Sequence, residues 1–467
     1  MLNIQLKPHR NALKSGTTEA QKLFAMLKLI PDAEVAATRP PLALALVIDT
    51  SASMQAFADQ DAARQLAKNA TPAGNVVDGG TFKGYDLNLP TLLDQAITAA
   101  HAMVDDQRFL PSDRITLVHF DDDARVLMPL TPISNRAGIH AAIELLRDYA
   151  GGTHMGKGLN AALSELGKVG PEVAKRAIVF TDGATFDEEE CLQTLPEFAR
   201  LNVPIIGVGF GEEYNDDLLK QLADATLGKP YGIKDINDFA ALIGAEVAQS
   251  TREVVTNLRA SISTVKGVTI DSISRVAPSL NDVDTTQKPF LLGNIERGDF
   301  TVFIVEMTIS GVERPPSRAR VAQIGLTAMA PALGKVQEFP PQNLFVEFTT
   351  DEAATAQVDP EVISYVQQKN VGKMVGEAMR TVSLDPGRAR QTLQIAAGMT
   401  QRIGNGAATQ MLQGALDELD KTGTISIATN KTVALGVRTK TVRTASMGDS
   451  SGTGGLSPEE IRRLTGT

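Results

Sequence analysis

Three short segments of the chain carry hydroxyls, carboxylates and glycines in an arrangement that could hold a metal ion. They are Asp49-Thr-Ser51-Ala-Ser53, Gly151-Gly152-Thr153 and Thr181-Asp182-Gly183. Hydroxyl and carboxylate oxygens are hard ligands, which suit Mg²⁺, Mn²⁺ or Ca²⁺ rather than zinc or copper. We therefore expect a divalent cation, with Mg²⁺ as the first choice and Mn²⁺ or Ca²⁺ as alternatives.

Few of these candidate ligands are charged. Neutral hydroxyls around a dication leave it electrophilic and short of one ligand. A carboxylate from an incoming Asp or Glu completes the octahedron and neutralises the charge. The chemistry that the three segments predict is adhesion to an acidic residue of another protein.

Buried strands lie directly before two of the segments. Continuous apolar runs predict strands at 42–49, 114–120, 176–182 and 203–211, with a weaker edge strand at 228–233. Residues 124–130 follow the Asp121-Asp122-Asp123 turn and are expected to pair antiparallel with the strand before it. Helical patterns lie between the strands, at about 91–104, 134–149, 155–168, 187–201, 215–226 and 235–249. This alternation predicts an α/β fold, with a doubly wound and mostly parallel sheet.

The strand ends bring the three segments together. Asp49 ends the first buried strand, Asp182 ends a later one, and Thr153 lies in a glycine-rich loop before a helix. Ligands bind beyond the carboxyl ends of parallel strands, where the strand order reverses. All three segments are therefore expected at one edge of the sheet.

The set resembles the signature of von Willebrand factor type A domains: DxSxS after the first strand, a distant GGT, and TDG after a later strand. The resemblance covers roughly residues 41–250 and fills all five motif positions. It implies a metal-ion-dependent adhesion site whose ligands are Asp49, Ser51, Ser53, Thr153 and Asp182. By the same resemblance the three hydroxyls would contact the metal directly or nearly so, and the two carboxylates would hold it largely through water.

The resemblance also suggests partners. The chain is similar to bacterial cytoplasmic proteins in which a type A domain accompanies β and helical modules, and some of these work with MoxR-type AAA ATPases. An adaptor subunit of such an ATPase or of a chelatase-like assembly is therefore an alternative to a free-standing adhesion protein. In relatives, ligand binding shifts the last helix of the domain, here about 235–249, and the junction near Glu253 would transmit that shift. Self-association through an acidic residue of a second copy also stays open.

Other interpretations of the same residues compete with this one. Ser and Asp after a strand often cap the next helix, and TDG is a common turn. A hydrolase using the cation as a Lewis acid needs a general base beside the metal, and the sequence names none. We therefore expect a binding protein and not an enzyme. Residues 55–90 are an insertion relative to the family pattern; they form either a specificity lid over the metal edge or a solvated loop.

The rest of the chain predicts further modules. Residues 1–40 and 253–350 carry β patterns and turn signals typical of an antiparallel β-sandwich: 21–30, 300–309 and 343–350 alternate between apolar and polar residues, and 320–329 is mixed. The type A domain, 41–252, is then inserted into that sandwich. Residues 358–445 form a helical region, in which Asp359 and Asp385 each cap a helix that begins with proline. Residues 425–443 alternate, which predicts a terminal hairpin or a segment that lies on another domain. Residues 446–467 are predicted to be a flexible tail with one short helix starting at Ser457.

Composition narrows the partners and the compartment. The 467 residues carry a formal net charge of -10, and the sequence pI is near 5.2. An acidic surface repels phosphate backbones and anionic lipid, which disfavours nucleic acid and membranes as partners. The single cysteine, Cys191, excludes an intrachain disulfide and fits a reducing compartment. With neither a signal peptide nor an apolar stretch of about 20 residues, we expect a cytoplasmic protein.

The remaining titratable candidates have simpler explanations. His154 follows Thr153 but has no place in the motif. His119 lies in an apolar strand and is expected to be packed rather than catalytic. Asp121, Asp122 and Asp123 are interpreted as a polar turn, with a second cation site as the alternative.

Overall fold

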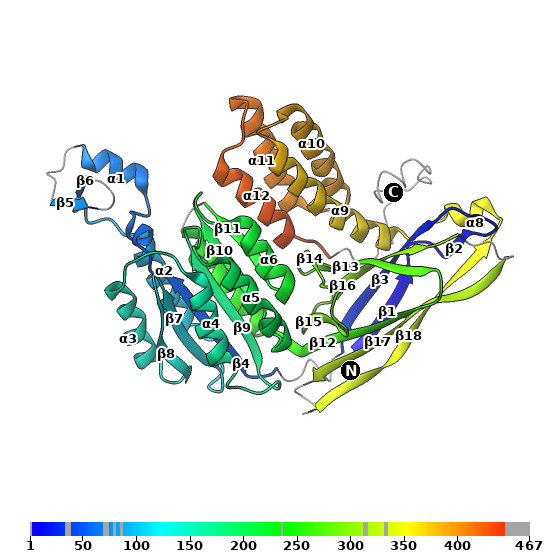
Figure 1. Ribbon diagram of the computed structural model, residues 1–467, viewed down its shortest axis with the longest axis horizontal. Coiled ribbons are helices and arrows are strands. Elements are labelled where there is room, and N and C mark those ends of the chain that lie inside the picture. The colour runs from blue at the N-terminus through cyan, green and yellow to red at the C-terminus, as the bar shows by residue number, and fades with distance from the viewer. Residues whose placement is uncertain are drawn as a thin grey trace.

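The structure is a computed structural model that describes residues 2–32, 39–68, 74–77, 81–84, 87–234, 237–311, 316–330 and 335–443. A six-stranded sheet forms the centre of one part, and Figure 1 shows helices on both of its faces. Its strands, in spatial order, are β11 (Lys229–Ile233), β10 (Ile205–Phe210), β9 (Ala174–Thr181), β4 (Leu42–Asp49), β7 (Arg114–Phe120) and β8 (Ala124–Pro132). Only β8 pairs antiparallel with its neighbour, as the sequence predicted. We call this part the α/β domain.

Alternate residues of β4 divide the core of the α/β domain into two layers, because successive side chains of a strand point to opposite faces. Leu44, Leu46 and Ile48 pack toward one layer of helices, and Ala45 and Val47 pack toward the other. The first layer contains α2 (Leu92–Val104), α3 (Arg136–Glu144) and α7 (Asn237–Ser250). The second contains α4 (Met155–Leu166), α5 (Glu188–Arg200) and α6 (Asp216–Thr226). The predicted doubly wound fold is confirmed.

The strand order reverses at β4. From β4 the chain moves to β7 and β8 on one side, and it then returns to β9, β10 and β11 on the other. The carboxyl ends of β4 and β9 lie side by side at this switch point, where open α/β sheets bind ligands. The sequence and the topology thus select the same edge.

The insertion after β4 has its own secondary structure. A short 3-10 turn (Ala52–Gln55) leads to α1 (Gln60–Ala67) and to a hairpin of β5 (Gly74–Val77) and β6 (Thr81–Gly84). Phe57 and Thr91 form a bridge that closes the base of the insertion. In Figure 1 α1 and the hairpin stand at one extremity of the molecule, beyond α2.

Two five-stranded sheets pack face to face as a β-sandwich with one shared core. The first contains β1 (Leu2–Pro8), β3 (Gln21–Pro31), β16 (Thr301–Ile309), β13 (Val268–Ala277) and β14 (Asn281–Asp282). The second contains β15 (Phe290–Glu296), β12 (Glu253–Thr264), β17 (Ser317–Ala330), β18 (Lys335–Thr349) and β2 (Ala12–Lys14). β3 pairs along its length with β16, although the α/β domain lies between them in the sequence. The α/β domain is therefore an insertion into the sandwich.

The C-terminal part of the described chain is helical. It contains α8 (Glu352–Ala356), α9 (Pro360–Thr381), α10 (Pro386–Arg402), α11 (Gly406–Thr422) and α12 (Ile427–Thr439). Asp359 accepts a hydrogen bond from Val362 N at 3.0 Å, and Asp385 accepts one from Arg388 N at 2.9 Å, so both predicted N-caps are present. Among the described residues no helix is long and apolar enough to cross a membrane. The tail predicted over 446–467 lies outside the described residues.

The predicted hairpin at 425–443 is wrong, because most of this segment is helix α12. Val433 and Val437 pack into the core of the helical region, whereas Leu435 packs into the core of the α/β domain. Residues two apart in a helix point in nearly opposite directions. A helix that is buried on two sides therefore shows the apolar alternation of a strand.

A buried ion cluster joins the α/β domain to the sandwich where α7 runs into β12. Arg176 of β9 donates to Glu246 of α7 at 3.0 Å and also pairs with Glu253, the first residue of β12. Lys229 of β11 donates to Glu246 at 2.7 Å. All four charged side chains are buried. The shift of α7 that the family resemblance implies stays a prediction, and this cluster is what such a shift would have to break.

Candidate functional site

Asp49 links two of the three predicted segments. It is the last residue of β4 and is fully buried. Its Oδ1 accepts a hydrogen bond from Ser51 N at 2.8 Å, which folds the loop after the strand into a tight turn. Its Oδ2 accepts from Thr181 Oγ1 at 2.6 Å, which ties that loop to the end of β9. Asp49 therefore sets the position of both loops.

The serines of the first loop reach the carboxylate of the third segment. The Ser51 and Ser53 Oγ atoms lie 3.0 Å apart, and Ser53 Oγ donates to Asp182 Oδ1 at 2.8 Å. Ser51 is buried and Ser53 is exposed. The hydroxyls thus run from the protein interior to the surface.

Thr153 reaches the same place from the glycine loop. A Cβ atom built on Gly183 would lie 3.7 Å from Thr153 Oγ1 and 3.9 Å from Ser53 Oγ, so two hydroxyls from different loops converge there. Backbone hydrogen bonds hold the loops together: Ala52 N donates to Gly151 O at 2.9 Å. The structure therefore brings together all five residues selected from the sequence.

The donor set fits a hard divalent cation. It has three hydroxyls and two carboxylates, and among the described residues no lysine or arginine forms an ion pair with Asp49 or Asp182. Burial raises the pKa of Asp49 to about 7, with a further contribution from the charge of Asp182, and burial also raises the pKa of Asp182. Positive charge beside the two carboxyls would favour their ionised forms.

This donor set differs from metal sites that are built mainly from carboxylates or histidines. Within the described part of the chain, no three His, Cys, Asp or Glu side chains cluster so as to hold a metal ion. A cation at this edge would depend on Ser51, Ser53 and Thr153 as much as on the carboxylates. Neutral ligands leave a dication with unbalanced charge, which a further carboxylate can neutralise.

The glycines before Thr153 lie against the carboxylate of Asp122. Cβ atoms built on Gly151 and Gly152 would lie 2.7 and 2.6 Å from the Asp122 carboxylate. In the same turn Asp121 Oδ1 accepts from Asp123 N at 3.0 Å, as expected for a polar turn. The sequence selected the glycines and placed Asp122 in a polar turn, but it did not predict the contact between that turn and the glycine loop.

The other candidates are placed as follows. His119 is buried, its Nδ1 lies 3.1 Å from Thr50 Oγ1, and its ring stacks on Tyr149 with centroids 3.7 Å apart. His154 is the N-cap residue of α4, and its Nδ1 lies 3.1 Å from Asp121 O. Cys191 is buried in α5, and burial raises the pKa of its thiol. Thr181, which fixes Asp49, belongs to a predicted segment but not to the predicted ligand set.

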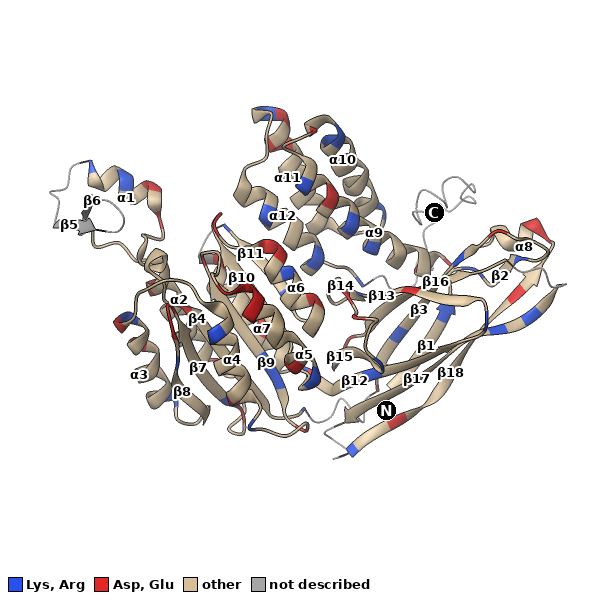
Figure 2. Ribbon diagram, in the orientation of Figure 1, with Lys and Arg blue, Asp and Glu red and all other residues tan. Residues whose placement is uncertain are grey.

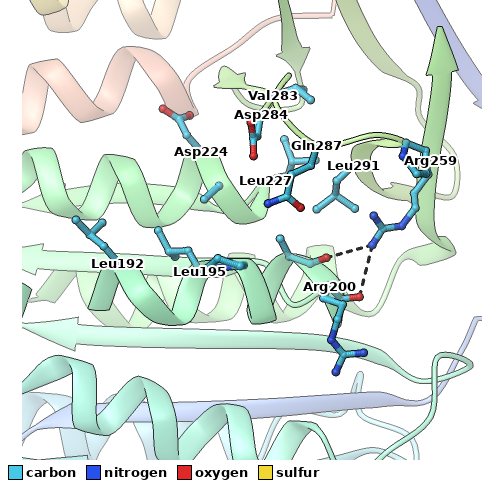
Figure 3. Close-up of a pocket in the computed structure, with 14 residues that line it drawn as sticks. Leu192, Leu195, Arg200, Asp224, Leu227, Arg259, Val283, Asp284, Gln287 and Leu291 are labelled. Atoms are coloured by element: carbon cyan, nitrogen blue, oxygen red, sulfur yellow. Dashed lines mark hydrogen bonds between the residues drawn. The ribbon is translucent and has the colours of Figure 1, made fainter. Parts of the chain in front are cut away.

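A groove of about 500 Å³ lies apart from this edge, between α5, α6 and the segment before β15. Figure 3 shows Leu195, Leu227 and Leu291 around it. Arg259 donates to the backbone oxygens of Ala199 and Arg200, at 3.3 and 3.5 Å. The groove contains none of the five predicted site residues.

Known protein sequences match the α/β domain of this chain. The model of the von Willebrand factor type A domain matches residues 90–244. The uncharacterized protein sll0103 of Synechocystis is 28% identical over 138 residues, which are 29% of this chain and 32% of that protein. The uncharacterized protein YfbK of Escherichia coli is 26% identical over 157 residues, which are 32% of this chain and 27% of that protein. The chain thus spans about a third of the length of these relatives.

Solved structures match the whole fold. A von Willebrand factor type A protein from Catenulispora acidiphila has a TM-score of 0.73 and 18% identity, over 94% of this chain and 97% of that one. The ArnB paralog VWA2 from Sulfolobus acidocaldarius has a TM-score of 0.62 and 16% identity, over 95% of this chain and 100% of that one. At these identities the likeness concerns the fold.

The family match begins at residue 90, just after the insertion, so it includes Thr153 and Asp182 but not β4 and its serines. The structure supplies the missing piece, because β4 pairs with β7 and β9 at the centre of the sheet. The chain therefore contains a von Willebrand factor type A domain, a fold that generally serves as a metal-dependent protein-interaction module.

Proposed function

We propose that this protein binds an acidic residue of a partner protein through a divalent cation held at the carboxyl edge of β4 and β9. Asp49, Ser51, Ser53, Thr153 and Asp182 would hold the cation, with Mg²⁺ as the first choice. The cation, when bound, supplies a coordination position for a carboxylate oxygen of the partner. The proposed activity is binding without turnover.

The convergence of the five side chains carries this proposal. They come from three loops, the first and last of which are 129 residues apart from Ser53 to Asp182, and they meet at the switch point of the sheet. Ordinary helix capping does not explain the convergence. Ser51 precedes the 3-10 turn, yet its side chain makes no capping hydrogen bond there, and its Oγ lies beside Ser53 Oγ instead.

Each residue has a separate task in this proposal. Asp49 is already engaged by Ser51 N and Thr181 Oγ1, so it orients the loops and adds negative charge from behind. Ser51, Ser53 and Thr153 offer hydroxyl oxygens; Ser53 is exposed, and the other two are buried. Asp182 accepts from Ser53, which fixes the serine rotamer before any ligand arrives. Such preorganisation lowers the entropic cost of binding.

The first experiment measures metal binding directly, with the full chain titrated with Mn²⁺ and the free ion followed by electron paramagnetic resonance. We expect one bound ion per chain in the wild type. We expect at least about tenfold weaker binding in Ser53→Ala, because a metal ligand is lost. Asp123→Asn is the matched control: Asp123 is exposed, lies in the neighbouring turn and is not in the set. Equal Mn²⁺ binding by all three proteins would contradict the proposed ligands.

The second experiment tests the partner. Wild type and Asp182→Ala are used to capture proteins from source-cell lysate, each in Mg²⁺ and in EDTA, and the captured proteins are crosslinked and mapped. We expect a crosslinked contact near an Asp or Glu of the partner, seen only with wild type in Mg²⁺. Identical capture in all four conditions would place recognition outside this edge and refute the proposal.

A further inference from the structure

An exposed aromatic side chain lies directly beside the proposed metal edge. Phe186 is 77% exposed. Its Cε2 lies 3.4 Å from a Cβ built on Gly152, so the ring covers the residue next to Thr153. Its backbone N donates to Thr153 O at 2.9 Å, and its ring centroid lies 5.7 Å from that of His154. The position of Phe186 is thus fixed to a proposed ligand.

An acidic groove begins at Phe186 and runs between α4 and α5. Its volume is about 780 Å³, and its acidic lining residues are Asp187, Glu189, Glu190 and Glu197. None of its lining residues is lysine or arginine. Glu189 and Glu190 accept hydrogen bonds from the side-chain amides of Gln193 and Asn160, at 3.2 and 2.7 Å, which leaves their charge uncompensated. In Figure 2 the acidic residues of α5 are coloured red along its ribbon.

Neither feature would identify a ligand by itself. Single exposed apolar residues are common on protein surfaces, and acidic residues in the first turn of a helix stabilise it through the helix dipole. Their meaning comes from continuity with the proposed site. Phe186 lines the groove and also touches the glycine loop, so one extended segment can reach the metal edge, the aromatic ring and the glutamates.

We infer that the partner segment that presents the acidic residue also carries an apolar side chain that packs on Phe186 and a lysine or arginine that enters the groove of Glu189 and Glu190. This inference rests on the proposed function and names the class of partner. Glutamates in the groove, together with the exposed Asp122 in the turn that faces the glycine loop, repel a uniformly acidic segment. An acid within a basic and apolar sequence satisfies all three contacts.

The test uses the full chain and a displayed library of random 12-residue peptides with one fixed central Asp. Peptides are bound in Mg²⁺ and eluted with EDTA, and a second library with Asn at the centre is the reference. We expect EDTA elution to enrich the Asp library alone, with basic and large apolar residues enriched about tenfold at flanking positions, which corresponds to about 1.4 kcal/mol of preference.

Variants assign the preferences to residues. Phe186→Ser should remove the apolar preference and weaken selected peptides at least about fivefold, as expected for a contact aromatic. Leu384→Ser is the matched control, because Leu384 is 84% exposed but lies in the turn between α9 and α10. The double charge reversal Glu189→Lys with Glu190→Lys should turn the basic preference into an acidic one.

The outcomes separate the two proposals. The inference would be overturned if Asp peptides were selected in Mg²⁺ without any preference at their flanking positions. It would also be overturned if the preference survived in Phe186→Ser and in the charge reversal. In both cases the proposed function would stand. Equal recovery of Asp and Asn peptides in Mg²⁺ and in EDTA would overturn both.

Discussion

The two ends of strand β9 carry polar clusters of opposite design. At the amino end Arg176 meets Glu246 and Glu253, and Lys229 adds a second positive charge, so cations and carboxylates balance. At the carboxyl end Thr181 and Asp182 meet Asp49 and hydroxyls without a paired lysine or arginine among the described residues. At about 3.3 Å per residue the two clusters are about 17 Å apart.

Burial acts on both clusters, and the partners decide the result. Burial by itself raises the pKa of Glu246, but Lys229 and Arg176 together outweigh it and lower that pKa. At Glu253 burial outweighs the single cation, Arg176, and the pKa stays raised. Burial raises the pKa of Asp182, and no neighbouring cation reverses the shift. At the amino end each carboxylate has a cationic partner within the protein. At the carboxyl end the carboxylates have only hydroxyl and backbone partners, an arrangement typical of binding sites. We call the amino end of β9, with Arg176, the balanced end, and its carboxyl end, with Asp182, the open end. The comparison predicts that mutations at the balanced end lower the stability of the fold, whereas mutations at the open end weaken cation binding.

The largest expected effect is at the balanced end. Arg176→Met should lower the free energy of unfolding by about 3–5 kcal/mol, because it leaves Glu246 and Glu253 buried without their shared partner. Urea unfolding in EDTA measures the loss. Arg176→Met combined with Glu253→Gln is the control and should recover part of the stability, because Glu246 keeps its ion pair with Lys229 and no unpaired carboxylate stays buried. A single variant as stable as the wild type would show that the cluster does not hold the two parts together.

The next effect belongs to the open end and depends on the cation. At a free Mg²⁺ concentration of a hundred times its dissociation constant, wild type should gain about 2.7 kcal/mol of unfolding free energy over EDTA. Asp182→Ala should lose this gain, while its stability in EDTA stays within about 1 kcal/mol of wild type. Arg176→Met should keep the gain. If Mg²⁺ stabilised Asp182→Ala as much as the wild type, the difference between the two ends would disappear.

The sequence predicted the open end better than the balanced one for a physical reason. The parallel strands are buried on both faces, so 42–49 and 176–182 are continuous apolar runs whose polar ends stand out. Arg176 is the first residue of the second run, and its partners come from α7 and β12, far along the chain. Pairing at that distance leaves no local pattern.

The strands of the sandwich were harder to predict. Strand β12 pairs with β15 through register shifts between Glu253, Val255, Leu258 and Arg259. Bulges of this kind break the alternation of apolar and polar residues on which strand prediction rests. β3 and β16, by contrast, pair without a shift over nine positions, and 300–309, which contains β16, shows the alternation that predicts a strand.

The smallest expected effect concerns the glycine loop at the open end. In Gly152→Ala the new Cβ would lie 2.6 Å from Asp122 Oδ1, so the carboxylate must move or Thr153 must shift. Asp122 is exposed and can turn toward solvent, so we expect Mn²⁺ affinity to fall only about threefold, or about 0.7 kcal/mol, with unchanged unfolding in EDTA. In a double-mutant cycle Asp122→Ala should restore the affinity of Gly152→Ala, because it removes the colliding group. A loss that Asp122→Ala does not rescue would mean that Gly152 is needed for the backbone path of the loop and not for its contact with Asp122. A loss of stability in EDTA would place the glycine loop with the balanced cluster, among the features that hold the fold together.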